Sequence, residues 1–284
     1  MKRRNVLIGL AAAFAAACMP HAEVAAQPFA SDRISVLVQG SGPDVILIPG
    51  LTASRDMWKG TVAAIPGYRY HLVQVNGFAG SKAGGNADGA VVEPVANEIA
   101  RYIKASKLDS PSLIGHSMGG TLAMMVAAHQ PRAAGRVMVV DMLPQPAGLF
   151  GGNASSMGPL ADSLRNVLTT TPSGRRLLGN LINRYGAEDD PARQSDPDVV
   201  ARATHDLARI DLGPDLPKIA APMTVLFATP GPDSPEHGRI VQNYRLSYSG
   251  AKTAKLRPIP KSGHMIMYDQ PVRFREEVKR FLAD

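Results

Sequence analysis

The sequence has few of the residues that hold covalent or metal-bound frameworks together. Only one of its 284 residues is cysteine, Cys18, and aromatic residues make up 5%. If Cys18 is removed with the N-terminus, the remaining chain can form no disulfide and no cysteine-rich zinc site. No H-E-x-x-H occurs, and neither does a phosphate-binding G-x-x-x-x-G-K or a G-x-G-x-x-G after the first strand. We therefore expect no metal and no cofactor.

A long charge run and a long apolar run are also absent. The formal charge is +7, and the basic residues are scattered, with Arg175 and Arg176 the only two adjacent arginines after the N-terminus. Such a distribution does not predict a nucleic-acid partner. The apolar stretch from Val6 to Ala17 is too short to remain as a membrane span. No pattern in the sequence predicts an oligomeric state.

Residues 1–26 have the pattern of a secretory signal peptide. Basic residues 2–4 precede the short apolar stretch, and small residues stand ahead of Gln27. We expect cleavage after Ala26 and export to the periplasm or the medium. The alternative is lipid attachment at Cys18, although Ala15 stands where such sites usually carry a larger aliphatic residue.

The most informative stretch runs from Pro111 to Pro131. A strand-like apolar run leads into Gly115-His-Ser117-Met-Gly119, and a helical apolar pattern follows. Glycines two residues before and two after a serine leave room for a sharp turn that exposes its hydroxyl beside the N-terminus of a helix. Ser117 is therefore the expected nucleophile.

This stretch resembles the nucleophile elbow of the α/β-hydrolase superfamily, and the resemblance extends from about Ile34 to the C-terminus. It implies an α/β fold with a mostly parallel central sheet, helices on both faces and a helical cap inserted after the sixth strand. The expected division is a core of residues 27–145 and 215–284 and a cap of residues 146–214.

The remaining patterns agree with alternating strands and helices. Residues 33–50 suggest a hairpin that leads into a buried strand, with its turn at Gly40-Ser-Gly-Pro43. Further patterns predict helices at 57–65, 91–108, 160–168, 177–182, 199–210 and 271–282, and strands at 68–75, 136–141, 223–229 and 254–260.

A serine hydroxyl needs a base and an acid that holds the base. His264 lies in a Gly-His loop after the final predicted strand, which matches the superfamily order of serine, acid, histidine. Asp233 is the favoured acid because it follows the strand that usually supplies it, and Asp141 is the alternative. The resemblance also implies an oxyanion hole formed by the backbone N–H groups of Leu51 and Met118.

These residues predict a serine hydrolase that cleaves carboxylic esters through an acyl-enzyme. A carbon–carbon bond hydrolase or an acyltransferase would share the motifs, and a non-catalytic binding protein of the same fold would have no need for them. The expected partner is a small molecule with an apolar acyl group. The predicted cap is rich in apolar side chains: Leu149, Phe150, Met157, Leu160, Leu164, Leu168, Leu177, Leu178, Leu181 and Ile182.

Overall fold

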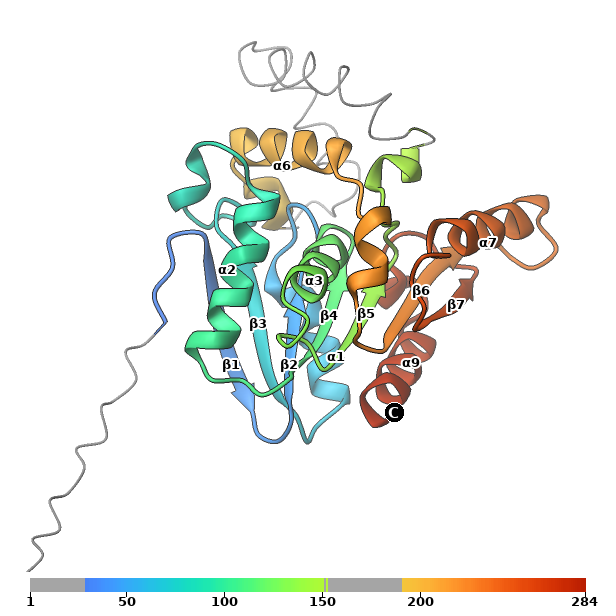
Figure 1. Ribbon diagram of the computed structural model, residues 1–284, viewed down its shortest axis with the longest axis horizontal. Helices are drawn as coiled ribbons and strands as arrows, with labels where there is room; N and C mark the ends of the chain where they lie inside the picture. The colour runs from blue at the N-terminus through green and yellow to red at the C-terminus, as the bar shows by residue number, and fades with distance from the viewer. Residues whose placement is uncertain (1–28, 151, 153–190) are drawn as a thin grey trace, which may run out of the picture.

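The computed structural model describes residues 29–150, 152 and 191–284. Within them, seven strands form one sheet in the order β1-β3-β2-β4-β5-β6-β7 (Figure 1). Only β1 is antiparallel to its neighbour. The strands are β1 (Ile34–Gly40), β2 (Asp44–Ile48), β3 (Arg69–Val75), β4 (Ser112–His116), β5 (Arg136–Val140), β6 (Met223–Thr229) and β7 (Ala254–Pro260). The predicted α/β class with a mostly parallel sheet is confirmed.

Helices cover both faces of the sheet (Figure 1). The α-helices are α1 (Lys59–Ala64), α2 (Val92–Ala105), α3 (Met118–His129), α6 (Pro197–Arg209), α7 (Pro235–Ser247), α8 (Ile266–Asp269) and α9 (Pro271–Ala283). Short 3-10 helices are η1 (Arg55–Trp58), η2 (Gly84–Ala87), η3 (Pro146–Phe150), η4 (Pro191–Gln194) and η5 (Gly213–Lys218).

Two hydrophobic clusters divide the core. One gathers side chains of α2, α3, α6 and α7 against one sheet face, and the other gathers those of η1, α8 and α9 against the opposite face. Trp58 and Phe274, both fully buried, stack in the second cluster with ring centroids 6.4 Å apart. Because both faces are covered, the central strands are apolar on both sides, as their sequences predicted.

The expected hairpin at residues 33–50 is wrong. β1 pairs with β3, which lies between β1 and β2, so the turn joins two strands that are not neighbours. The turn crosses the backbone before β3 very closely: a Cβ on Gly40, whose φ is +82°, would lie 2.4 Å from the Tyr68 carbonyl oxygen. Glycine in this conformation lets the chain pass over the start of β3.

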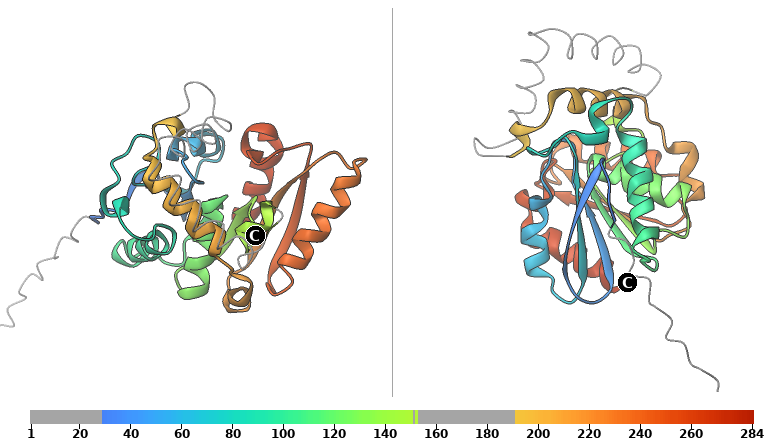
Figure 2. Two further views of the ribbon diagram at one scale, coloured as in Figure 1. Left: turned by 90° about the horizontal axis from the view of Figure 1, so that it is seen from above. Right: turned by 90° about the vertical axis from the view of Figure 1, so that its left-hand side faces the viewer.

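The interval 146–214 lies between β5 and β6, so it follows the fifth strand of the described sheet and not the sixth. The predicted helix at 199–210 is confirmed as α6, which lies above the carboxyl ends of the central strands (Figure 2). The patterns at 160–168 and 177–182 and the signal peptide lie outside the described residues. The helix α7 was not predicted. No helix in the described ranges is long and apolar enough to cross a membrane.

Candidate active site

Ser117 lies at the turn between β4 and α3, with φ 53° and ψ −124°. Non-glycine residues rarely adopt this conformation, which costs roughly 1–3 kcal/mol and is maintained by the surrounding contacts. A Cβ on Gly115 would lie 2.0 Å from the Gly119 carbonyl oxygen, and one on Gly119 would lie 2.2 Å from that of Ile48. Both flanking positions therefore require glycine, and the expected strand, sharp turn and helix are present.

The loop of residues 49–52, which follows β2, lies directly against this turn. A Cβ on Gly50 would lie 3.1 Å from Ser117 Cβ. Among the described residues, neither the Leu51 nor the Met118 N–H donates to an acceptor. Both amides are thus available to an external oxygen, as an oxyanion hole requires.

His264 follows β7, and its Nδ1 lies 2.7 Å from Asp141 Oδ2. A carboxylate can only accept, so this bond assigns the ring proton to Nδ1 and leaves Nε2 as the basic nitrogen. The preference for Asp233 is corrected here: Asp233 is exposed in the turn before α7. Asp141, the alternative, lies in the hydrogen bond with His264 because it directly follows β5 at the same edge of the sheet.

Asp141 is held by several contacts. Its own backbone has φ 53° and its N–H donates to the Leu226 carbonyl at 2.8 Å. The Ala228 N–H donates to Oδ1 at 2.8 Å, and Tyr244 Oη donates to the same oxygen at 3.2 Å. Sequence reasoning missed Tyr244, although its helix begins with a recognisable Ser234-Pro235 cap.

His116 connects the serine strand to the histidine loop. Its Nε2 donates to the His264 carbonyl at 2.9 Å, and the two rings lie 4.7 Å apart, centroid to centroid. Burial lowers the pKa of His116 to about 3, and the nearby His264 adds to this effect. The ring is therefore neutral near pH 7, and its buried Nδ1 has no partner among the described residues.

A second contribution that sequence reasoning missed comes from the segment before α6. Ser195 is buried; its hydroxyl donates to the Thr52 carbonyl at 3.2 Å and accepts the Ala79 N–H at 2.9 Å. The next residue, Asp196, donates its N–H to Gly77 and caps α6 with its carboxylate. The returning chain thereby supports the 49–52 loop.

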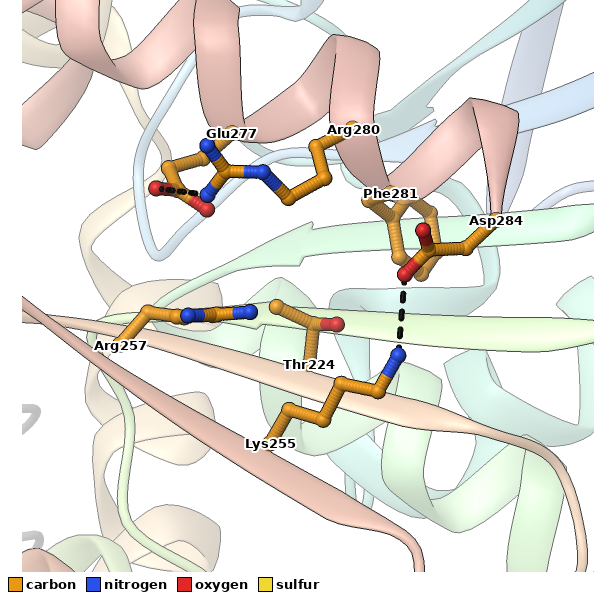
Figure 3. A pocket seen from close by; sticks show the side chains of 7 residues that line it. All are labelled: Thr224, Lys255, Arg257, Glu277, Arg280, Phe281 and Asp284. Atoms are coloured by element: carbon orange, nitrogen blue, oxygen red, sulfur yellow. Dashed lines mark hydrogen bonds and ion pairs between the residues drawn. The ribbon is translucent and has the colours of Figure 1, made fainter.

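No group of three or more acidic, histidine or cysteine residues in the described ranges is placed to hold a metal ion. A small hollow lies near the amino ends of β6 and β7 (Figure 3). Ser117 follows the carboxyl end of β4, so the hollow lies at the opposite end of the parallel strands. Two ion pairs, Lys255 with Asp284 at 3.0 Å and Arg280 with Glu277 at 2.7 Å, occupy its rim. Because its charged side chains pair with one another and none of the predicted site residues lines it, the hollow is not part of the site around Ser117. It is lined by Thr224, Lys255, Arg257, Glu277, Arg280, Phe281 and Asp284.

Residues 45–277 match the alpha/beta hydrolase family, to which the chain belongs. The resemblance inferred from the elbow is therefore confirmed. Among curated relatives, the pimeloyl-[acyl-carrier protein] methyl ester esterase of Aeromonas hydrophila is 24% identical, covering 88% of this chain and 99% of its own length. The N-formylmaleamate deformylase of Pseudomonas putida is 27% identical, covering 81% and 85%.

Solved structures agree with the fold. A thermophilic esterase from Thermogutta terrifontis superposes with a TM-score of 0.69 at 21% identity, covering 88% of this chain and 93% of that one. An esterase from Exiguobacterium antarcticum gives 0.67 at 21% identity, covering 88% and 96%.

Proposed function

We propose that the chain is an exported serine hydrolase that cleaves carboxylic esters through an acyl-enzyme. The observation that carries the proposal is the joint arrangement at the carboxyl edge of the sheet. The strained turn holds Ser117 beside two unengaged amides, and Asp141 Oδ2 accepts a hydrogen bond from His264 Nδ1. The His116 ring, next in sequence to the serine, hydrogen-bonds to the backbone of His264.

In the acylation step, Ser117 Oγ bonds to the ester carbonyl carbon and its proton passes to His264 Nε2. The carbonyl electron pair moves onto oxygen, which the N–H groups of Leu51 and Met118 stabilise as an oxyanion. When the carbonyl re-forms, the carbon–oxygen bond to the alcohol breaks, and His264 returns the proton to the leaving alcohol. Asp141 stabilises the imidazolium in between and keeps its ring orientation.

In deacylation, water takes the place of the serine hydroxyl. His264 Nε2 accepts a proton from the water as its oxygen bonds to the acyl carbon. Collapse of the second oxyanion breaks the bond to Ser117 Oγ, which recovers its proton from His264 and releases the carboxylic acid.

The relatives support an ester as substrate. The Aeromonas hydrophila relative is named a methyl ester esterase, and both structural neighbours are named esterases. The Pseudomonas putida relative is named a deformylase. An assay panel should therefore include a methyl ester and an N-formyl compound besides activated esters.

The direct test uses the purified protein with a fluorophosphonate probe and p-nitrophenyl butyrate. Wild type should be labelled at Ser117, and Ser117→Ala should lose the label and about 10⁴-fold or more in kcat. Ser110→Ala is the matched control, because Ser110 also has a positive φ but is exposed away from the elbow. Unchanged turnover or labelling in Ser117→Ala would refute the proposal.

The acyl group is proposed to be neutral, apolar and of small to medium length, on the basis of the apolar residues of the 146–214 interval. Each added methylene that is buried contributes about 0.8 kcal/mol, so kcat/KM should rise about three- to fourfold per carbon until the pocket is full. Acetate, butyrate, hexanoate and octanoate esters measure this rise. Arg165, Arg175, Arg176 and Arg184 could instead favour a charged acyl group. A preference for an ester with a free carboxylate would therefore contradict the apolar assignment.

A further inference from the structure

Helix α7 places two tyrosines against the end of the sheet that carries Asp141. Tyr244 is 3% exposed, and its ring stacks on Phe227 of β6 with centroids 4.1 Å apart and an interplanar angle of 13°. Tyr248, one turn later, is also 3% exposed, and its ring lies 6.3 Å from that of Tyr244 at 9°. The stack fixes where the two hydroxyl groups lie.

The Tyr244 hydroxyl adds a donor to an oxygen that already has one. Asp141 Oδ1 accepts from Tyr244 Oη at 3.2 Å and from the Ala228 N–H at 2.8 Å, whereas Oδ2 is 2.7 Å from His264 Nδ1. Oδ1 is therefore bound by groups of β6 and α7, whereas Oδ2 is bound by the His264 imidazole. Burial, with the charge of Asp141 as a second cause, raises the pKa of Tyr244 well above 10, so the phenol remains a donor.

Resting on the proposed function, we infer that Tyr244 is a positioning residue for the acid. It holds Asp141 in the rotamer that turns Oδ2 to His264, and it takes up part of the carboxylate charge. In doing so it sets the pH at which His264 becomes a free base.

The titratable neighbours of this carboxylate come from three further elements. His264 lies after β7, His116 ends β4, and Tyr244 and Tyr248 lie on and directly after α7. His116 is neutral because burial lowers its pKa to about 3, and burial raises the pKa of Tyr248 well above 10. Asp269 of α8 accepts the N–H of Gly263, the residue before His264, at 2.7 Å, and it is the same in all variants. Asp141 is the carboxylate that hydrogen-bonds to the His264 ring itself.

Removing the Tyr244 hydroxyl has a defined electrostatic direction. The carboxylate loses a donor, so more of its negative charge faces the ring and the imidazolium is stabilised. With one donor fewer, the Asp141 carboxylate is also protonated more readily. Both effects move the acid limb of activity to higher pH, because the ring must lose its proton to act as a base.

Tyr248 provides a matched control. Its hydroxyl donates to the Met142 carbonyl at 2.7 Å and, within the described part of the chain, forms no hydrogen bond with Asp141. Tyr248→Phe therefore removes an equally buried hydroxyl from a stacked ring without changing the donors on the acid. A loss that is only structural should appear in both variants.

The experiment compares wild type, Tyr244→Phe and Tyr248→Phe in two measurements: NMR titration of the His264 imidazole and kcat/KM against pH. In Tyr244→Phe, both midpoints should rise by about half to one pH unit relative to wild type, and kcat should fall about three- to tenfold. In Tyr248→Phe both midpoints should stay within about 0.2 pH units of the wild-type values. An unmoved midpoint in Tyr244→Phe, or the same shift in both variants, would overturn the inference.

The NMR titration requires no substrate. If the protein hydrolyses none of the tested esters, the proposed function fails, while the titration still decides the role of Tyr244. If Tyr244→Phe is active with a wild-type midpoint, the inference fails and the hydrolase assignment stands. Thermal unfolding of each variant verifies that the compared proteins are folded.

Discussion

Replacing Asp141 with asparagine tests the acid assignment, because the surroundings dictate how the amide must lie. The Ala228 N–H and the Tyr244 hydroxyl both donate to Oδ1, so this position has to remain an oxygen. The amide NH₂ would then stand where Oδ2 now lies 2.7 Å from His264 Nδ1, and two donors would face each other. This clash of two donors is avoided when the His264 ring carries its proton on Nε2 and accepts through Nδ1.

A ring protonated on Nε2 cannot take the proton of Ser117. We therefore expect Asp141→Asn to lower kcat about 10⁴-fold, the size found when a serine-protease triad loses its carboxylate in the same way. Stability should fall by only about 1–2 kcal/mol, because every polar atom regains a partner after the tautomer changes. Asp233→Asn, at an exposed turn position, should change kcat less than about threefold.

The assay has two parts: turnover of p-nitrophenyl butyrate and the ¹⁵N shifts of the His264 imidazole. The shifts should report a proton on Nδ1 in wild type and on Nε2 in Asp141→Asn. A large loss in Asp233→Asn with near wild-type turnover in Asp141→Asn would return the acid role to Asp233. An imidazole still protonated on Nδ1 in Asp141→Asn would refute the tautomer argument.

Three further predictions follow from the site and the N-terminus. Gly50→Ala places a Cβ 3.0 Å from His116 Nδ1 and 3.1 Å from Ser117 Cβ, so the 49–52 loop or these two neighbours must shift by a few tenths of an ångström. Because this shift disturbs the placement of the Leu51 N–H beside Ser117, kcat should fall about 10- to 100-fold with a normal unfolding temperature. The pKa of His116 falls from 6.5 to about 3 on burial, so the unfolded chain binds more protons between these values and stability is lost as pH falls through them. Urea unfolding should show a slope about 1.4 kcal/mol per pH unit larger in wild type than in His116→Asn. N-terminal sequencing of exported protein should begin at Gln27; a lipid-modified Cys18 or an uncleaved chain would contradict this.

The elbow could be predicted from the sequence because its chemistry is local. Ser117 needs a positive φ, and Gly115 and Gly119 need to lack a side chain, all within five residues. The parallel sheet could also be predicted from the sequence, since apolar runs without alternation indicate strands covered on both faces. His264 followed from its place after the last strand.

The carboxylate that hydrogen-bonds to His264 was not predictable in this way, because Asp141 and Asp233 follow neighbouring strands at the same edge of the sheet. The choice depends on α7, which the apolar pattern did not reveal: Tyr244 is the one residue of this helix that is buried. Ile240 and Val241 pack only partly buried against the core, so α7 has a weak apolar stripe in the sequence. The helix α7 begins at Pro235, shortly after β6 ends, and Asp233 lies exposed in the turn between them.

The sheet order explains why Asp141 receives hydrogen bonds from Ala228 and Tyr244. Asp141 follows β5 and His264 follows β7, so the carboxylate must bridge the end of β6, which lies between them. Ala228 of β6 donates its backbone N–H to Oδ1 at the point of crossing, and Tyr244 covers the same oxygen from above Phe227. An acid on β6 itself would be adjacent to β7 and would need no such bridge. The strand β6, which separates Asp141 from His264, thus also supplies a donor that orients the Asp141 carboxylate, and Tyr244 of α7 supplies the second.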